Sequence, residues 1–501
     1  MKGSPREDIQ VEGTGTSHFG SNWKRAGNPT GVFEGSSKQV TIKGGASAQF
    51  GFNFEHLLSG GRLPSWTDII PPPSAFYGIN SKNLGRDKID GAGLNKGLFE
   101  LATSQEVVGY YNQLMSQHFL PSGRVSYFSQ CEYTGDGKFH SLLTGEKFQI
   151  GERARIVDAT FMKVSVPAMI PPAYEVAPGV KLIAPNELVK LPRKYANYIV
   201  IGAGKTGIDA CLWFLGNGVD PSDISWIMPR DSWLLDREAI QPRELFAKRR
   251  FKDQKSLFLS ATSATSVAGL FKDLESSGQL MRLTDKVWPS MYRCATVSRL
   301  ELEEIRRIQN VIRMGRVIRV ERDEIQLQKG VYKPNPDILY INCTADGLAK
   351  LPTVPVFNGR YITLQSVRVC QQVFSASFIA HVDATYDDEK PKNELCCPIP
   401  HPYKATDWMT TVIKSLRARK LWNSHPKTAA WLLQARLNVD KHHLPDDPEG
   451  RAAVIELIDE LGGVMATKLT ELLSTLPANE SANAKAQISK IHGSIKEPSK
   501  L

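Results

Sequence analysis

The residues best suited to chemistry form a glycine-rich stretch in the middle of the chain. Residues 202–207 read Gly-Ala-Gly-Lys-Thr-Gly. At this spacing Gly202 allows a tight turn, Gly204 lets the backbone approach a pyrophosphate, and Gly207 lets a helix pack close to a strand. The free N–H groups at the positive end of that helix bind phosphates. The pattern predicts a dinucleotide site, and the alternative is a strand–turn–helix with no ligand.

The flanking sequence predicts the elements that must position this turn. An apolar run at 198–201 is typical of a buried strand. An amphipathic helix is expected after the turn, because apolar residues recur there at helical spacing: Ile208, Cys211, Leu212 and Leu215. Strand, turn and helix together are the context in which the glycine pattern indicates a nucleotide site. We therefore add Lys205 and Thr206, inside the turn, to the expected cofactor-binding residues.

The end of the next predicted strand bears on which nicotinamide cofactor is used. Residues 225–228 form an apolar strand pattern that closes with Pro-Arg-Asp. An acidic residue at this place binds the ribose 2′-hydroxyl of NAD, whereas an arginine suits the 2′-phosphate of NADP. Arg230 favours NADP, and Asp231, one residue later, leaves NAD open.

Two other apolar strands end in small and polar residues. One runs into Asp-Ala-Thr at 158–160, and another runs into Thr-Ala-Asp-Gly at 344–347. A small residue at the carboxyl end of a parallel strand leaves room for a cofactor at that edge of the sheet. Simple packing of each strand end is the alternative. The expected contacts are Asp158, Thr160, Thr344, Asp346 and Gly347.

The bulk composition excludes several classes of function. The 501 residues should form two or three domains, and the net charge of +10 is dispersed with no basic and aromatic stripe for nucleic acid. Neither a signal peptide nor an apolar membrane span is apparent, so a cytoplasmic protein is expected. None of the seven cysteines forms Cys-x-x-Cys, which argues against a dithiol redox enzyme and a metal site.

The remaining segments give a coarse map of the chain. Residues 1–61 are rich in Gly, Ser, Thr and Asn, and we expect loop or poorly ordered chain there. A helix is predicted at 106–119, and mainly helical structure over 240–300. Another helix is predicted from apolar residues between 302 and 312. From 450 the pattern is an amphipathic helix that packs on the protein or forms a homodimer.

Several of these motifs together resemble the flavoprotein oxidoreductases that have two dinucleotide-binding domains. The likeness is to proteins similar to flavin-containing monooxygenases and to pyridine nucleotide-disulfide oxidoreductases, and it covers about 71–440. The motifs that carry it are Pro-Ser-Ala-Phe-Tyr-Gly at 73–78, Val-Ile-Gly-Ala-Gly-Lys-Thr-Gly at 200–207, Trp-Ile-Met-Pro-Arg-Asp at 226–231, Met-Tyr-Arg-Cys-Ala-Thr-Val-Ser at 291–298 and Cys-Thr-Ala-Asp-Gly-Leu at 343–348.

The resemblance implies an α/β fold with two Rossmann-like domains, the NAD(P)-binding one inserted in the FAD-binding one. The implied parts are an atypical segment at 1–61, FAD-domain pieces at 62–195 and 336–445, an NADP-binding domain at 196–335, and a helical tail at 446–501. The implied activity is hydride transfer from NADPH to FAD, followed by monooxygenation of a small organic molecule or by electron transfer alone. The strand-end residues would then serve FAD, and the glycine turn with Arg230 would serve NADP.

Three departures from the family pattern qualify this implication. Residues 1–61 do not match the strand and glycine motif that bind FAD in the family, so FAD is inferred from the second half of its site. The monooxygenase fingerprint Phe-x-Gly-x-x-x-His is missing before the glycine turn, where 177–184 read Ala-Pro-Gly-Val-Lys-Leu-Ile-Ala. The reductase dithiol is missing too. An NADP-binding pseudoenzyme or regulatory protein that has lost its flavin is the alternative.

Overall fold

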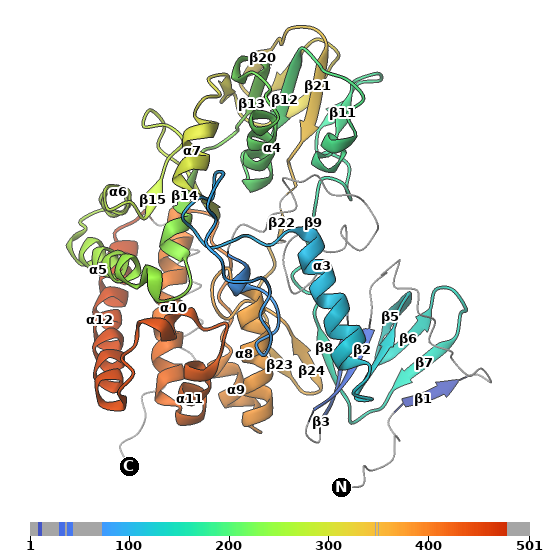
Figure 1. The fold of residues 1–501 in the computed structure, drawn as a ribbon, viewed down its shortest axis with the longest axis vertical. Helices are drawn as coiled ribbons and strands as arrows, with labels where there is room; N and C mark the ends of the chain where they lie inside the picture. The colour runs from blue at the N-terminus through green and yellow to red at the C-terminus, as the bar shows by residue number, and fades with distance from the viewer. Residues whose placement is uncertain are drawn as a thin grey trace.

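The chain has a mixed α/β architecture in which several sheets are joined by helical segments (Figure 1). The structure is a computed structural model that describes residues 9–12, 30–35, 38–43, 73–345, 347–348 and 350–477. None of the helices within these ranges is long and apolar enough to cross a membrane.

A five-stranded parallel sheet forms one end of the molecule (Figure 1). Its order is β11-β21-β12-β13-β17. The strands are β11 (Leu182–Ile183), β12 (Asn197–Ile201), β13 (Ile224–Ile227), β17 (Val311–Ile312) and β21 (Ile338–Asn342). All five residues of β12 are buried, as expected for a parallel strand that is covered on both faces. The predicted strands at 198–201 and 225–228 are thereby confirmed to within a residue or two.

Different layers cover the two faces of this parallel sheet. On one face Tyr198 and Val200 pack in a core with Phe214 of α4 (Lys205–Gly216). The helix α7 (Arg299–Ile305) packs beside α4. On the other face Ile199 and Ile201 pack against a small sheet. Its strands are β10 (Glu175–Val176), β18 (Val317–Val320), β19 (Ile325–Leu327) and β20 (Gly330–Tyr332).

A six-stranded sheet forms the other main layer, in the order β23-β24-β8-β3-β2-β4. Its strands are β2 (Thr30–Gly35), β3 (Lys38–Lys43), β4 (Val125–Phe128), β8 (Arg155–Asp158), β23 (Phe357–Asn358) and β24 (Tyr361–Thr363). The strand β8 is parallel to both β3 and β24. Since β24 follows the whole parallel sheet in the chain, the five-stranded unit is an insertion between β8 and β24.

The expectation of a loop over 1–61 was wrong for three stretches. Besides β2 and β3, residues Ile9–Glu12 form β1, which pairs with β7 (Lys147–Ile150). The hairpin of β2 and β3 is completed by β4 on one side and β8 on the other. Strand formation depends on such neighbours more than on intrinsic preference, and local composition did not reveal them. The other residues of 1–61 lie outside the described part of the chain.

Helices and short strands complete the fold. The tail helix α12 (Pro448–Ser474) packs on α10 (Ala405–Ser424) and α5 (Ala247–Ser263), which confirms a helix after 450. The remaining helices are α3 (Ser104–Gln113), η2 (Leu114–Phe119), α6 (Val267–Ser276), α8 (Gln372–Thr385), α9 (Glu389–Leu395) and α11 (Pro426–Gln434). The short 3₁₀ segments are η1 (Ser74–Phe76), η3 (Pro185–Lys190), η4 (Pro221–Asp223), η5 (Arg237–Ile240), η6 (Glu244–Phe246) and η7 (Val439–His443).

A third sheet, β15-β14-β16, lies beside these helices. Its strands are β14 (Ser232–Asp236), β15 (Leu280–Met281) and β16 (Met291–Val297). The expectation of mainly helix over 240–300 therefore missed β15 and β16. The helix expected up to 312 ends at Ile305, and Ile312 belongs to β17, because the parallel sheet offers a buried partner. The other short strands are β5 (Cys131–Gly135), β6 (Lys138–Ser141), β9 (Val164–Ser165) and β22 (Gly347–Leu348).

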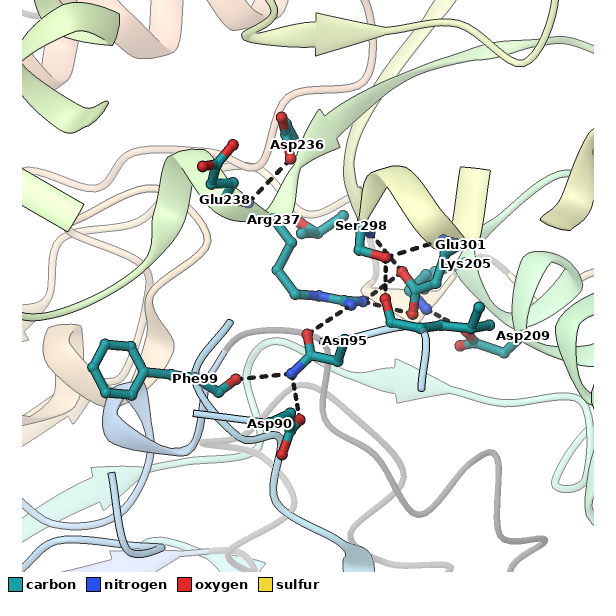
Figure 2. A network of polar contacts seen from close by, with 12 residues as sticks. Asp90, Asn95, Phe99, Lys205, Asp209, Asp236, Arg237, Glu238, Ser298 and Glu301 are labelled. Carbon is teal, nitrogen blue, oxygen red and sulfur yellow. Dashed lines mark hydrogen bonds and ion pairs between the residues drawn. The ribbon is translucent and has the colours of Figure 1, made fainter. Parts of the chain in front are cut away.

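A buried ion pair joins four separate segments of the chain (Figure 2). The Arg237 side chain is 1% exposed, and its Nη2 lies 2.7 Å from Glu301 Oε2 on α7. Arg237 Nη1 also donates to Asn95 Oδ1 at 3.2 Å, which ties in the 90–99 loop. Glu301 additionally accepts from the backbone N of Ser298, the N-cap of α7. Lys205 and Asp209 of α4 pair next to this network.

We expect Glu301→Gln to lower the free energy of unfolding by about 3 kcal/mol, because it removes the carboxylate that pairs with the buried guanidinium of Arg237. The glutamine keeps an oxygen for the backbone N–H of Ser298, so the cap is retained. Urea unfolding followed by circular dichroism measures the loss. Glu304→Gln on the same helix removes an exposed pair with Arg307 and should cost less than about 1 kcal/mol. Equal losses in the two variants would contradict the role given to the buried pair.

Candidate functional site

The glycine turn joins β12 to α4, as the sequence predicts. Gly202 follows β12 and has φ +131°, a backbone conformation that favours glycine. Gly204 is the N-cap of α4, and its backbone is extended. The helix therefore begins at Lys205, with its first N–H groups directed at the space beyond the turn. This is the arrangement that receives a phosphate group.

Each of the three glycines meets a different constraint. A Cβ on Gly202 would lie 2.4 Å from the carbonyl oxygen of Cys343, and one on Gly207 would lie 2.2 Å from the carbonyl oxygen of Gly202. A Cβ on Gly204 would meet nothing within 4 Å. Gly202 and Gly207 are thus required by close packing of the protein on itself. Within the described residues nothing packs against the open face of Gly204, so this face is available to a ligand.

The turn lies where the sheet changes direction. The chain passes from β12 to β13 on one side, and β21 pairs with the other side of β12. In open α/β sheets, ligands bind in the crevice beyond the carboxyl ends of strands at such a point. Thr206 borders the cavity described below. Lys205 borders it too, but its ammonium pairs with Asp209 one helical turn later. Burial raises the pKa of the Asp209 carboxyl, and the charge of Lys205 opposes that rise.

The two strand ends that the sequence singles out have the same local structure. Asp158 Oδ1 accepts from the backbone N and the hydroxyl of Thr160, at 2.9 and 2.6 Å. Asn342 Oδ1 accepts in the same way from Thr344, at 3.2 and 2.6 Å. Asn-Cys-Thr at 342–344 therefore forms the same turn as Asp-Ala-Thr at 158–160. The family resemblance had instead paired 158–160 with 344–347, which begins two residues later. The two strand ends match in turn geometry.

The segments that leave these two turns come together. Gly347 and Leu348 in β22 pair with Ser165 and Val164 in β9. Thr344 borders the cavity. Asp346 lies outside the described residues. The structure therefore joins the segments that follow the two strand ends through the pairing of β22 with β9, and Asp158 and Thr160 are not among the residues that line the cavity.

Three cations surround one tyrosine near the end of β13. Arg230 Nη2 donates to the Tyr403 hydroxyl at 2.7 Å. Lys350 Nζ lies 3.4 Å, and the Arg293 guanidinium 4.9 Å, from the centre of the Tyr403 ring. Burial alone would raise the pKa of Tyr403, but the hydrogen bond and charge of Arg230, with Lys350, bring it below the usual value. Among the described residues, neither Arg230 nor Lys350 has a carboxylate partner. The cluster is therefore suited to an anion.

Asp231, the residue that left NAD open, lies in a buried ion pair. It is 5% exposed, and its two carboxylate oxygens accept from Arg313 Nε and Nη2 at 2.8 and 2.9 Å. The bidentate pair orients this carboxylate toward Arg313. Arg230, by contrast, is exposed and directed toward Tyr403.

One cavity of about 2740 Å³ connects these features. It extends along the glycine turn, the cations around Tyr403 and Thr344. It exceeds the roughly 300–1,000 Å³ of a pocket for one small ligand. Its walls include residues of the parallel sheet, of the β15-β14-β16 sheet, and of α10 and α12. Within the described part of the chain, the open face of Gly204 looks into the same space.

A thiol pair on the cavity wall escaped the sequence reasoning. Cys294 and Cys370 are 76 residues apart in the chain, and their sulfur atoms lie 2.7 Å apart. His401 places a ring nitrogen within 4.8 Å of both. The absence of Cys-x-x-Cys argued against such a pair, but the fold assembles it from separate segments. Two thiolates on one zinc ion at about 2.3 Å each stand roughly 3.8 Å apart. The two sulfurs would have to separate by about 1 Å to share one zinc ion.

The chain is similar to three uncharacterized proteins from mycobacteria. No protein-family model matches it. It is 47% identical over 422 residues to the uncharacterized proteins Rv2000 and MT2056 of Mycobacterium tuberculosis and Mb2023 of Mycobacterium bovis. The match covers 82% of this chain and 78% of each relative. The chain therefore belongs to the same family as these proteins.

The glycine constraints give a direct test of the turn. We expect Gly207→Ala to lower the free energy of unfolding by roughly 3 kcal/mol, because its methyl group would overlap the Gly202 carbonyl. Gly204→Ala adds the same methyl group into open space. It should change the free energy of unfolding by less than about 1 kcal/mol. Thermal and urea unfolding of both variants make the comparison. A Gly207→Ala protein as stable as the parent would refute the close packing.

Proposed function

We propose that the protein is an NADPH-dependent flavoprotein oxidoreductase that acts on a small organic molecule. In this proposal the parallel sheet is an NADP-binding Rossmann domain inserted in an FAD-binding domain. The observation that carries it is the glycine turn. Gly202 and Gly207 are held by contact with protein backbone, while Gly204 faces an open cavity at the switch point of the sheet. That combination is what a bound pyrophosphate requires.

The cations around Tyr403 support NADP over NAD in this proposal. They lie beyond β13, the strand whose end meets the cofactor ribose in dinucleotide domains. Arg230 and Lys350 would hold the 2′-phosphate, with the Tyr403 hydroxyl as a further donor. The pairing of Asp231 with Arg313 removes the acidic group that would select NAD.

The FAD part of the proposal rests on the family resemblance and on the insertion topology. The chain leaves the six-stranded sheet after β8 and returns to it at β24, as a two-domain flavoprotein requires. Thr344 and Gly347, with the turn at Asp158 and Thr160, would line the flavin side. A bound flavin would supply the capacity to take a hydride from NADPH and to deliver electrons to oxygen or to an organic substrate.

The sequence of residues 1–61 supports a second candidate function, an NADP-binding protein without flavin. These residues do not match the first glycine motif of flavoproteins. A protein that binds NADP without flavin, as a pseudoenzyme or regulator, is consistent with that mismatch. Cytoplasmic location and homodimer formation stay predictions.

Arg230→Ala tests the choice of nicotinamide cofactor. We expect the Kd for NADPH to rise about 10- to 100-fold, since a charge-assisted hydrogen bond to phosphate contributes about 1.5–3 kcal/mol. The Kd for NADH, which lacks the 2′-phosphate, should change less than about threefold. Calorimetric titration of both ligands into parent and variant gives the four values. Equal weakening of NADPH and NADH would remove Arg230 from the 2′-phosphate site.

Purification of the full-length protein tests the flavin. We expect a yellow protein with absorbance near roughly 450 nm that NADPH bleaches in the absence of oxygen. Colourless protein that FAD cannot reconstitute, but that still binds NADPH, would overturn the flavoenzyme and favour the NADP-binding alternative. Gly204→Val serves as the control, because its side chain fills the open face of the turn and should abolish bleaching by NADPH while leaving bound flavin in place.

A further inference from the structure

We propose that Cys294 and Cys370 form a reversible dithiol–disulfide centre on the cavity wall that exchanges with small disulfide molecules. The proposal rests on how the two sulfurs and His401 are placed, and it requires neither nicotinamide nor flavin. Both cysteines are partly exposed to the cavity. A covalent bond needs the two sulfurs, now 2.7 Å apart, to approach to about 2.0 Å, a movement of less than about 1 Å.

The backbone is strained at both cysteines. Cys294 has φ +55° and Cys370 has φ +54°, in the left-handed region that non-glycine residues seldom adopt. Such conformations cost about 1–3 kcal/mol and persist where the surrounding structure imposes them. On β16 the conformation accompanies a break in strand register. Tyr292 pairs with Trp233 of β14 and Ala295 pairs with Leu234, so the two residues between them are extra to the β14 register and form a bulge. The bulge turns Cys294 toward Cys370.

His401 is oriented to assist one of the two thiols. Its Nδ1 lies 3.1 Å from the carbonyl oxygen of Pro402. A carbonyl only accepts, so the proton of this bond sits on Nδ1, and Nε2 is the nitrogen left for Cys370. When Nε2 is protonated, it donates to the Cys370 sulfur and stabilises the thiolate. This is the imidazolium–thiolate pairing that makes a cysteine reactive.

The charges around the pair make the two thiols unequal. The hydrogen bond between Cys370 and Cys294 lowers the pKa of Cys370, burial opposes this, and His401 adds to the lowering. The same hydrogen bond raises the pKa of Cys294. Burial and the charge of Arg293 lower the pKa of His401, but the charge of Cys370 outweighs both, so the pKa of His401 is raised. Burial raises the pKa of the Tyr292 phenol. Cys370 is therefore the attacking thiol and Cys294 the resolving one.

The other described thiols lack this environment. Burial raises the pKa of four of them. These are Cys131, Cys211, Cys343 and Cys396. Cys397 also borders the cavity, but burial raises its pKa as well, and no second sulfur is placed against it in the described structure. Cys397 is thus a matched control at the same wall.

The exchange balances in atoms and electrons. The Cys370 thiolate attacks one sulfur of a disulfide R–S–S–R, whose S–S bond breaks, and a mixed disulfide forms as one RS⁻ leaves and takes the proton held by His401. Cys294 then gives its proton to His401 and attacks the Cys370 sulfur. The Cys294–Cys370 bond forms, the bond to SR breaks, and the second RS⁻ leaves with that proton. Two electrons pass from the protein to the small disulfide, which is released as two thiols.

The test is to incubate the full-length protein with oxidised glutathione and to map its cysteines by alkylation and mass spectrometry. We expect one cross-linked peptide pair that contains Cys294 and Cys370, and its reversal by dithiothreitol. Cys294→Ser should instead accumulate glutathione on Cys370, because the resolving thiol is missing. Cys370→Ser should accumulate little on Cys294. Cys397→Ser should behave as the parent does.

A pH profile separates a reactive thiol from a merely close pair. At pH 6, alkylation of Cys370 by iodoacetamide should be at least about tenfold slower in His401→Gln than in the parent, and the two rates should converge near pH 9. Failure of the folded parent to cross-link would overturn the proposal. So would zinc binding that requires both cysteines and prevents the cross-link. Because neither assay uses NADPH or FAD, these outcomes are independent of the proposed function.

Discussion

The contact between the glycine turn and its two neighbouring strands is the constraint on which the site depends. The Gly202 carbonyl accepts from Trp226 Nε1 of β13 at 2.7 Å and also touches Gly207 of α4. On the other side, Gly202 lies against the Cys343 carbonyl at the end of β21. One residue thus sets the distance between three strands and a helix. Because no side chain fits there, the turn keeps one shape, and the helix N-terminus stays directed into the cavity.

The rest of the candidate site follows from where those strand ends lead. Beyond β13 the chain presents Arg230, and beyond β21 it presents Thr344 and then Lys350, so cationic and hydroxyl groups meet at one edge of the sheet. The insertion of the parallel sheet between β8 and β24 brings a second turn of the same geometry, at Asp158 and Thr160, to the neighbouring layer.

The parts of this arrangement that could be predicted from sequence are those set by neighbours in the chain. The glycine turn, its strand and its helix depend on residues within about twenty positions, and periodicity revealed them. The hairpin of β2 and β3 depends on pairing with β8, more than one hundred residues away, and composition suggested a loop. The grouping of Arg293 and Lys350 on Tyr403 likewise depends on three distant segments. The bulge in β16 could not be predicted either, because a pattern of alternating apolar residues does not reveal where a strand gains extra residues.

That bulge connects two features that are otherwise separate. The two residues that it adds to the strand are adjacent, and one directs a guanidinium toward Tyr403 while the other directs a thiol toward Cys370. A strand without the bulge would place these side chains on opposite faces of the sheet. The cations around Tyr403 and the thiol pair therefore share one irregular turn of backbone.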